Sequence, residues 1–87
     1  MQIEDYAILN TGCIVEHECV INCAAHIGPG VVLAGNVIVG RRTFVGANAV
    51  IKQGIKIGDD VVIGAGSVII NDIPNNAKIV GNPARTI

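Results

Sequence analysis

From Ile3 to Ile69, every sixth residue of the chain is isoleucine, leucine or valine. The residue two places before each of these apolar anchors is mostly small, and the residue after the anchor is often glycine. A fixed period of this kind is typical of repeat architectures, in which each unit buries its apolar residue against neighbouring units. The pattern predicts a three-sided coil of short parallel strands. The anchors are Ile3, Leu9, Val15, Ile21, Ile27, Leu33, Val39, Val45, Ile51, Ile57, Ile63 and Ile69.

Other folds fit this period poorly. On an α-helix, residues six apart are rotated by about 600°, so the anchors would not form one apolar stripe. A meander of hairpins would need turn signals at irregular intervals, and nothing interrupts the period before Asn71. The single tyrosine, the single phenylalanine and the lack of tryptophan suit a narrow interior that large rings would overpack.

Three six-residue units close one coil, so residues 18 apart stack, and residues 1–70 form about four coils. The stacking defines three corners. The bare corner has few side chains, the reactive corner contains a histidine between two glutamates, and the charged corner contains arginine and aspartate pairs. Their members are 10–12, 28–30, 46–48 and 64–66 for the bare corner, 16–18, 34–36 and 52–54 for the reactive corner, and 22–24, 40–42 and 58–60 for the charged corner. We expect the charged corner in solvent and the other two facing a ligand or a neighbouring chain.

Length and composition exclude several classes of protein. Eighty-seven residues make one domain, and a net charge of −1 gives no electrostatic footprint for nucleic acid. No apolar run is long enough to span a membrane, and no signal peptide is recognised. Cys13 and Cys19 fall on inward positions and Cys23 falls on a turn, which favours free thiols and a reducing cytoplasm over disulfides or a cysteine-based metal site.

The last segment, residues 71–87, breaks the period. Pro74, Gly81 and Pro83 predict a loop with a final strand around residues 77–80, acting as a cap or as a strap over the side of the prism. We therefore divide the chain into a repeat domain, 1–70, and a C-terminal extension, 71–87. A prism of four coils exposes flat faces and open strand edges, so we expect a symmetric oligomer to bury them.

The candidate reactive group lies at the reactive corner. His17 is expected outside the core, and the adjoining Glu18 is placed to hold one ring nitrogen and raise the basicity of the other. Gly35 lies one coil away at the same corner and leaves its backbone N–H accessible. Asn36 stacks over Glu18 and is placed to orient it. A surface histidine without function is the competing interpretation of His17, and a partly buried filler is that of His26, which stacks near Phe44 on the following side.

Seven segments between residues 10 and 85 resemble the hexapeptide-repeat acetyltransferases. The resemblance covers nearly the whole chain and is strongest to the sialic acid O-acetyltransferase-like branch, which includes nucleotide-amino-sugar N-acetyltransferases. The repeat alone is shared by proteins with many functions, whereas NTG followed by HEC and then LAGN is more specific. The matching segments are 10–20 (NTGCIVEHECV), 26–30 (HIGPG), 33–40 (LAGNVIVG), 45–50 (VGANAV), 63–68 (IGAGSV), 72–74 (DIP) and 81–85 (GNPAR).

The resemblance implies a left-handed parallel β-helix, a homotrimer, and acetyl-CoA bound in clefts between neighbouring prisms. It implies that His17 is the general base and that Glu18 raises its basicity. It further implies that His26 touches the acetyl donor and that Gly35 offers its amide to the thioester carbonyl. In the same family, the residues matching Ala47 and Ala65 line the coenzyme cleft through their backbone.

Members of this branch also carry an N-terminal nucleotide-binding-like domain that holds the acceptor sugar. No such domain precedes the repeat here, which leaves open a fragment of a longer protein or a natural short relative.

We therefore predict an acetyl-CoA-dependent O- or N-acetyltransferase, or its β-helix domain, that acts on a sugar or nucleotide-sugar acceptor by direct transfer. The expected partners are two further copies of the chain and a small-molecule acceptor. The first alternative is a non-catalytic trimeric scaffold or a CoA-binding fragment without its acceptor domain. A zinc enzyme of the γ-carbonic-anhydrase type needs three histidines per site, and the chain has only His17 and His26, so we predict no metal.

Overall fold

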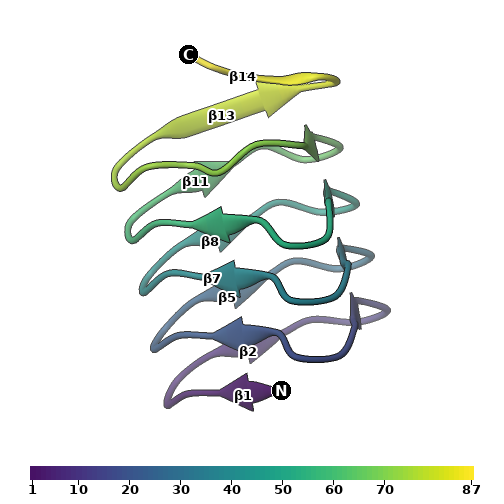
Figure 1. Ribbon diagram of the computed structural model, residues 1–87, viewed down its shortest axis with the longest axis vertical. Helices are drawn as coiled ribbons and strands as arrows, with labels where there is room; N and C mark the ends of the chain where they lie inside the picture. The colour runs from purple at the N-terminus through teal and green to yellow at the C-terminus, as the bar shows by residue number, and fades with distance from the viewer.

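The structure, a computed structural model that describes all of residues 1–87, is a prism wound from short strands, with the two termini at opposite ends (Figure 1). It has no helix, and therefore none that crosses a membrane. The strands are β1 (Gln2–Ile3), β2 (Ile8–Leu9), β3 (Ile14–Val15), β4 (Val20–Ile21), β5 (His26–Ile27), β6 (Val32–Leu33), β7 (Ile38–Val39), β8 (Phe44–Val45), β9 (Val50–Ile51), β10 (Lys56–Ile57), β11 (Val62–Ile63), β12 (Val68–Ile69), β13 (Lys78–Gly81) and β14 (Ala84–Thr86).

The strands form three sheets, one for each side of the prism. Side A contains β1, β4, β7 and β10, side B contains β2, β5, β8, β11, β13 and β14, and side C contains β3, β6, β9 and β12. Neighbouring strands from β1 to β12 are parallel and pair residues 18 apart, as Ile3 pairs with Ile21. The predicted fold, a left-handed parallel β-helix of about four coils, is confirmed.

The anchors fill the centre of the prism. From the second coil onward they are 0–1% exposed, and buried Cys19, Ala25 and Ala49 occupy inward small positions between them. The first coil differs, because Ile3 is 47% exposed and Leu9 is 37% exposed. These two residues have the same place in the repeat as the buried anchors but have no coil beneath them.

Two inward positions carry hydroxyl groups, and both are satisfied. The Thr43 hydroxyl donates to the Gly58 carbonyl at 2.6 Å and accepts from the Val61 N–H at 3.1 Å. The Ser67 hydroxyl donates to the Gly64 carbonyl at 2.7 Å and accepts from the Gly81 N–H at 3.2 Å. Because buried hydroxyl groups are costly when unpaired, these bonds explain how a polar residue replaces an apolar one inside the prism.

Each corner turns through a residue with positive φ, three places after the anchor. Glycine holds this place at residues 12, 30, 54 and 66, where φ is 71–79°, and other residue types hold it elsewhere with φ of 55–65°. The glycines directly after the anchors have a different role, because their φ is not positive. At Gly46, an added Cβ would lie 2.6 Å from the Ala65 nitrogen of the next coil, so this glycine permits the close stacking of backbones.

The segment after Ile69 continues the winding with two residues fewer. Ile73 forms a parallel bridge with Ile57, and Ile79 pairs with Ile63, so both are offset by 16 residues instead of 18. The chain then reverses, and β14 pairs antiparallel with β13 at the end of side B. Residues 71–81 therefore extend the coil on sides A and B, and the hairpin closes the C-terminal end of side B.

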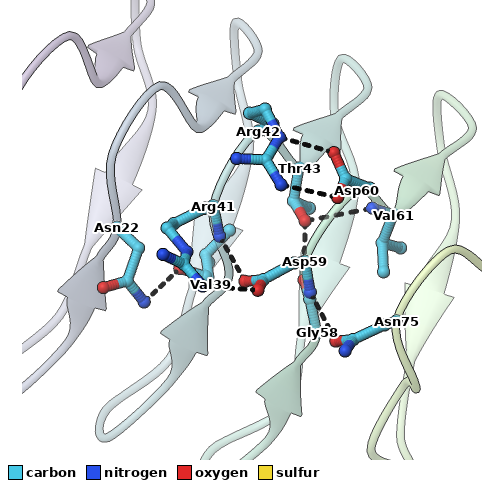
Figure 2. Close-up of polar contacts among 10 residues, drawn as sticks. All are labelled: Asn22, Val39, Arg41, Arg42, Thr43, Gly58, Asp59, Asp60, Val61 and Asn75. Carbon is cyan, nitrogen blue, oxygen red and sulfur yellow. Dashed lines mark hydrogen bonds and ion pairs between the residues drawn. The ribbon is translucent and has the colours of Figure 1, made fainter.

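The charged corner is held by ion pairs between successive coils (Figure 2). Arg42 makes two bonds to the Asp60 carboxylate, at 2.7 and 2.8 Å, and Arg41 lies 3.3 Å from Asp59. Asp59 also caps the Arg41 N–H at 2.7 Å, and Asn75 caps the Asp59 N–H at 2.8 Å. The hydrogen bond and charge of Arg42 lower the pKa of Asp60 below its ordinary value of 3.8. The corner therefore consists of self-paired, exposed charges.

Replacing the inward Ile63 by aspartate should unfold the repeat. Ile63 is 0% exposed, and an unpaired buried carboxylate costs several kcal/mol. The matched control is Val62→Asp, since Val62 is the outward neighbour and is 45% exposed. Thermal melts followed by circular dichroism should show a much lower Tm for Ile63→Asp only. Equal losses for the two variants would contradict the assigned inward face.

The Arg42–Asp60 pair should make a small, pH-dependent contribution to stability. Because the pKa of Asp60 is lowered in the folded chain, its stabilising effect is present above pH 3.8 and is lost as the pH falls through the lowered value. Asp60→Asn should therefore reduce Tm slightly at pH 7 and not at about pH 2. Glu4→Gln, which removes a carboxylate that has no ion pair, is the control. A pH-independent effect of Asp60→Asn would exclude the ion pair as its cause.

Candidate active site

The reactive corner brings one predicted pair of residues together. His17 is the first turn residue between β3 and β4, and its carbonyl accepts a hydrogen bond from the Asn36 N–H at 3.0 Å. A Cβ added at Gly35 would lie 2.8 Å from His17 Cε1 and 2.9 Å from Nε2. The φ of Gly35 is not in the positive range, so any residue could adopt its backbone conformation. A side chain at this position would displace the imidazole ring, which occupies that space.

The amide of Gly35 is a free donor. Gly35 is buried, yet its N–H makes no hydrogen bond within the chain. The equivalent N–H groups of His17, Cys23 and Gln53 also have no partner, so an unpaired amide is a general feature of this turn. The feature particular to Gly35 is the histidine ring beside it.

Glu18 lies at the same corner but is not bonded to His17. Glu18 is exposed, has φ of 60°, and makes no side-chain hydrogen bond. Asn36 has the same conformation in the next coil, and its side chain does not contact Glu18 through a hydrogen bond. The orienting bonds considered from the sequence are therefore not formed within a single chain. The positive φ of Glu18 is shared by the equivalent turn residue of other coils, so it reflects the turn and is not a signal of function.

The bare corner presents two more free amides. Ala47 and Ala65 are the first turn residues in successive coils between sides B and C, and neither N–H has a partner in the chain. Their small side chains leave these donors open to a ligand that lies along the corner. Arg85, which closes the GNPAR segment, lies on β14 at the C-terminal end of side B.

His26 lies on the outer face of side B and is half-buried. Its ring centre is 5.0 Å from that of Phe44, in an edge-to-face arrangement of 69°. The reactive corner joins sides C and A, so it is opposite side B in a three-sided prism. His17 and His26 of one chain therefore face away from each other. A site that uses both histidines needs a second copy of the chain.

Two shallow clefts at the C-terminal end were not anticipated from the repeat. One lies on side A where the coil shortens, and the other lies against the hairpin. The first is lined by Lys56, Gly58, Asp72, Ile73, Pro74 and Asn75. The sequence feature that accompanies this cleft is the loss of two residues from the six-residue period after Ile69. Neither cleft contains His17, Glu18, His26 or Gly35. No group of three metal-ligating side chains is present.

Comparisons with known proteins find the same fold in several acetyltransferases. The family described as hexapeptide repeat of succinyl-transferase matches residues 36–70. Perosamine N-acetyltransferase from Caulobacter crescentus, solved with CoA and GDP-perosamine, is 42% identical with a TM-score of 0.97, over 98% of this chain and 40% of that one. The acetyltransferase domain of PglB from Neisseria gonorrhoeae, solved with acetyl coenzyme A, is 34% identical with a TM-score of 0.91, over 98% and 44% of the two chains.

Over nearly its whole length, the chain is similar to hexapeptide-repeat acetyltransferases. Serine acetyltransferase from Neisseria gonorrhoeae is a further structure with the same fold, at 30% identity and a TM-score of 0.92 over 99% of this chain and 39% of that one. The chain spans about two fifths of the length of these family members.

Gly35→Ala should displace the His17 ring. The added methyl group would lie 2.8 Å from His17 Cε1, so one of the two must move. The ring-proton NMR signals of His17 should shift, and Gly35→Ala should destabilise the chain by about 1 kcal/mol only when His17 is present. The control is the same substitution in a His17→Ala background. An identical effect in both backgrounds would show that the glycine serves the turn and not the ring.

Proposed function

We propose that this chain forms the donor-binding and catalytic part of an acetyl-CoA-dependent acetyltransferase that acetylates the amino group of a nucleotide-linked sugar. The observation that carries the proposal is the contact of the His17 ring with Gly35, whose buried N–H has no partner. This pair combines a proton acceptor with a donor for a developing oxyanion, which are the two groups that acyl transfer requires. The acceptor class is supported by the relative that was solved with CoA and GDP-perosamine.

A trimer would complete this site. Side C has only aliphatic outward residues, whereas side A presents Gln2 and Lys56 and side B presents His26 and Lys78. Side C also lies opposite the charged corner, because that corner joins sides A and B. Placing side C toward a threefold axis buries the aliphatic stripe and leaves the ion pairs in solvent. The stripe consists of Ile14, Val32, Val50 and Val68.

This arrangement brings the separated site residues together. With side C inward, the reactive corner of one chain meets the bare corner of the next, and side A of the first faces side B of the second. His17 of one chain then faces His26 of its neighbour. The two residues are nine positions apart, half of an 18-residue coil, so their heights along the axis differ by only about 2.4 Å. In this trimer, His17 and His26, which point in opposite directions within one chain, lie on facing sides of a cleft between two chains.

The charges of the chain orient the coenzyme in this cleft. Residues 1–40 contain no lysine or arginine, and the unpaired cations follow later in the chain. Lys56 lies on side A, and Lys78 and Arg85 lie on side B, so they flank the C-terminal end of the same cleft. The phosphates would lie there, and the free amides of Ala47 and Ala65 would bind the amide-rich arm that leads down to His17.

The chemistry is a direct transfer. Bound acetyl-CoA supplies an activated acetyl group. His17 removes a proton from the acceptor amine as the amine nitrogen attacks the thioester carbonyl, and the Gly35 N–H stabilises the oxyanion that develops there. The C–N bond forms, the C–S bond breaks, and CoA leaves as a thiol that takes the proton from His17. His26 of the neighbouring chain contacts the donor, and Glu18 increases the basicity of His17 when the corner is enclosed. We further propose a cytoplasmic location, where Cys13, Cys19 and Cys23 remain free thiols.

The alternative function is a trimeric scaffold without catalysis. It would retain the aliphatic side C and would need neither the free amides nor the contact between His17 and Gly35. Calorimetry of the purified protein with CoA separates the two functions. Micromolar to low-millimolar binding supports the transferase, and an absence of binding at millimolar CoA favours the scaffold.

The mass in solution should correspond to three chains, that is three times 9.0 kDa or about 27 kDa. Val50→Glu, on side C, should yield monomers, because it places charge at the threefold axis. Ile38→Glu, on side A, is the matched control, since the two residues point outward with exposures of 41% and 36%. Light scattering that shows a monomeric parent, or equal effects of both variants, would contradict the arrangement.

Substitution of the two histidines should affect different quantities, the rate of acetyl transfer for His17 and the affinity for the acetyl donor for His26. His17→Ala should reduce the rate of acetyl transfer by about 10²–10⁴-fold and leave CoA affinity nearly unchanged, because it removes the general base. His26→Ala should instead weaken donor binding. The assay uses a nucleotide-linked amino sugar, or a small amine at high concentration, with calorimetry for binding. Mild and equal losses for both variants would show that the reactive corner has no catalytic role.

A further inference from the structure

His26 and Phe44 lie next to each other on the outer face of side B, in the neighbouring strands β5 and β8. They are register partners, and their ring centres are 5.0 Å apart with an angle of 69° between the ring planes. This separation and angle fall within the edge-to-face arrangement that aromatic rings prefer. Phe44 is the single phenylalanine of the chain, and no other pair of aromatic rings is in contact.

The imidazole of His26 has no polar partner within the chain. Neither ring nitrogen makes a hydrogen bond. Without such a bond, rotation of a histidine ring about its last side-chain torsion is only weakly restricted, so packing must set the plane of the ring. The other strand neighbour of His26 is the aliphatic Ile8. Phe44 is therefore the neighbour whose ring geometry can fix the orientation of the imidazole.

The phenyl ring of Phe44 is not part of the core. Phe44 points outward and is 42% exposed, whereas the anchor that follows it, Val45, is 0% exposed. The same outward position on nearby strands of side B holds Ile8 and Val62, so an aliphatic residue satisfies the strand equally well. The consequence that only an aromatic residue has at this position is the ring contact with His26.

We propose that Phe44 is a positioning residue for the acetyl donor. It acts through His26, whose imidazole it holds in the orientation that meets the thioester of acetyl-CoA. This inference rests on the proposed function, in which His26 contacts the donor in the cleft between two chains. Because CoA without the acetyl group has no thioester carbonyl, Phe44 contributes to the preference for acetyl-CoA over CoA.

Calorimetry of the full chain with acetyl-CoA and with CoA tests the role of the ring. Phe44→Leu, which keeps an apolar side chain, should lower the affinity for acetyl-CoA about three- to tenfold and that for CoA by less than about twofold. Phe44→Tyr keeps the ring and should retain both affinities within about twofold. In the protein without ligand, the ring-proton NMR signals of His26 should shift in Phe44→Leu and remain nearly unchanged in Phe44→Tyr. A purely structural role would weaken binding of both coenzymes equally, which would overturn the proposal.

A double-mutant cycle tests whether Phe44 acts through His26. In a His26→Ala background, Phe44→Leu should cause no further loss of affinity for acetyl-CoA. The control is Val62→Ala, since Val62 pairs with Phe44 on the side away from His26, and its effect should be the same in both backgrounds. An undiminished effect of Phe44→Leu without His26 would overturn the proposal, because Phe44 would then contact the donor itself.

The same measurements distinguish this inference from the proposed function. If the parent chain binds neither coenzyme, the proposed function fails and the inference fails with it. If the parent binds acetyl-CoA and Phe44→Leu binds it equally well, only the inference fails.

Discussion

The stacking of each coil on the next, with an offset of 18 residues, is the constraint on which the rest of the structure depends. Backbone hydrogen bonds between coils and burial of the anchors both require this offset, and neither can be satisfied by one coil alone. The glycines after the anchors follow from it, since the backbone of the next coil passes where a side chain would lie. So do the ion pairs of the charged corner, which join residues 18 apart.

The same stacking makes the corners chemically distinct. A residue type that recurs at one corner forms a line parallel to the prism axis, and each line has one character: charged, bare or reactive. Unpaired amides occur at turn residues of all three corners, among them Gly35, Ala47 and Cys23. The prism therefore presents lines of donors and small residues, which suit an extended ligand better than a compact one. The proposed coenzyme cleft uses two such lines from neighbouring chains, which explains how so small a fold can hold a long co-substrate.

The stacking changes at the two ends of the prism. At the C-terminal end the period loses two residues, the coil contracts, and the hairpin of β13 and β14 covers side B. At the N-terminal end, the anchors Ile3 and Leu9 are exposed. The outer faces of the prism also differ, because only side C has no polar outward residue. The aliphatic face of side C accounts for the proposed trimer.

The sequence by itself determined the three-sided coil, the inward residues and the corner to which each polar side chain belongs, because a six-residue period places residues 18 apart in register. The left-handed winding was implied by the family resemblance and not by the period. It also predicted the neighbourhood of His17 and Gly35, since residues 18 apart must stack. The tertiary structure alone showed that the His17 ring occupies the space of the missing Gly35 side chain, that Glu18 is not bonded to His17, and that His26 faces away from both. It also showed that the coil resumes after Ile69 with two residues fewer. Those features depend on ring placement, turn conformation and the direction of each face, which a one-dimensional period does not contain.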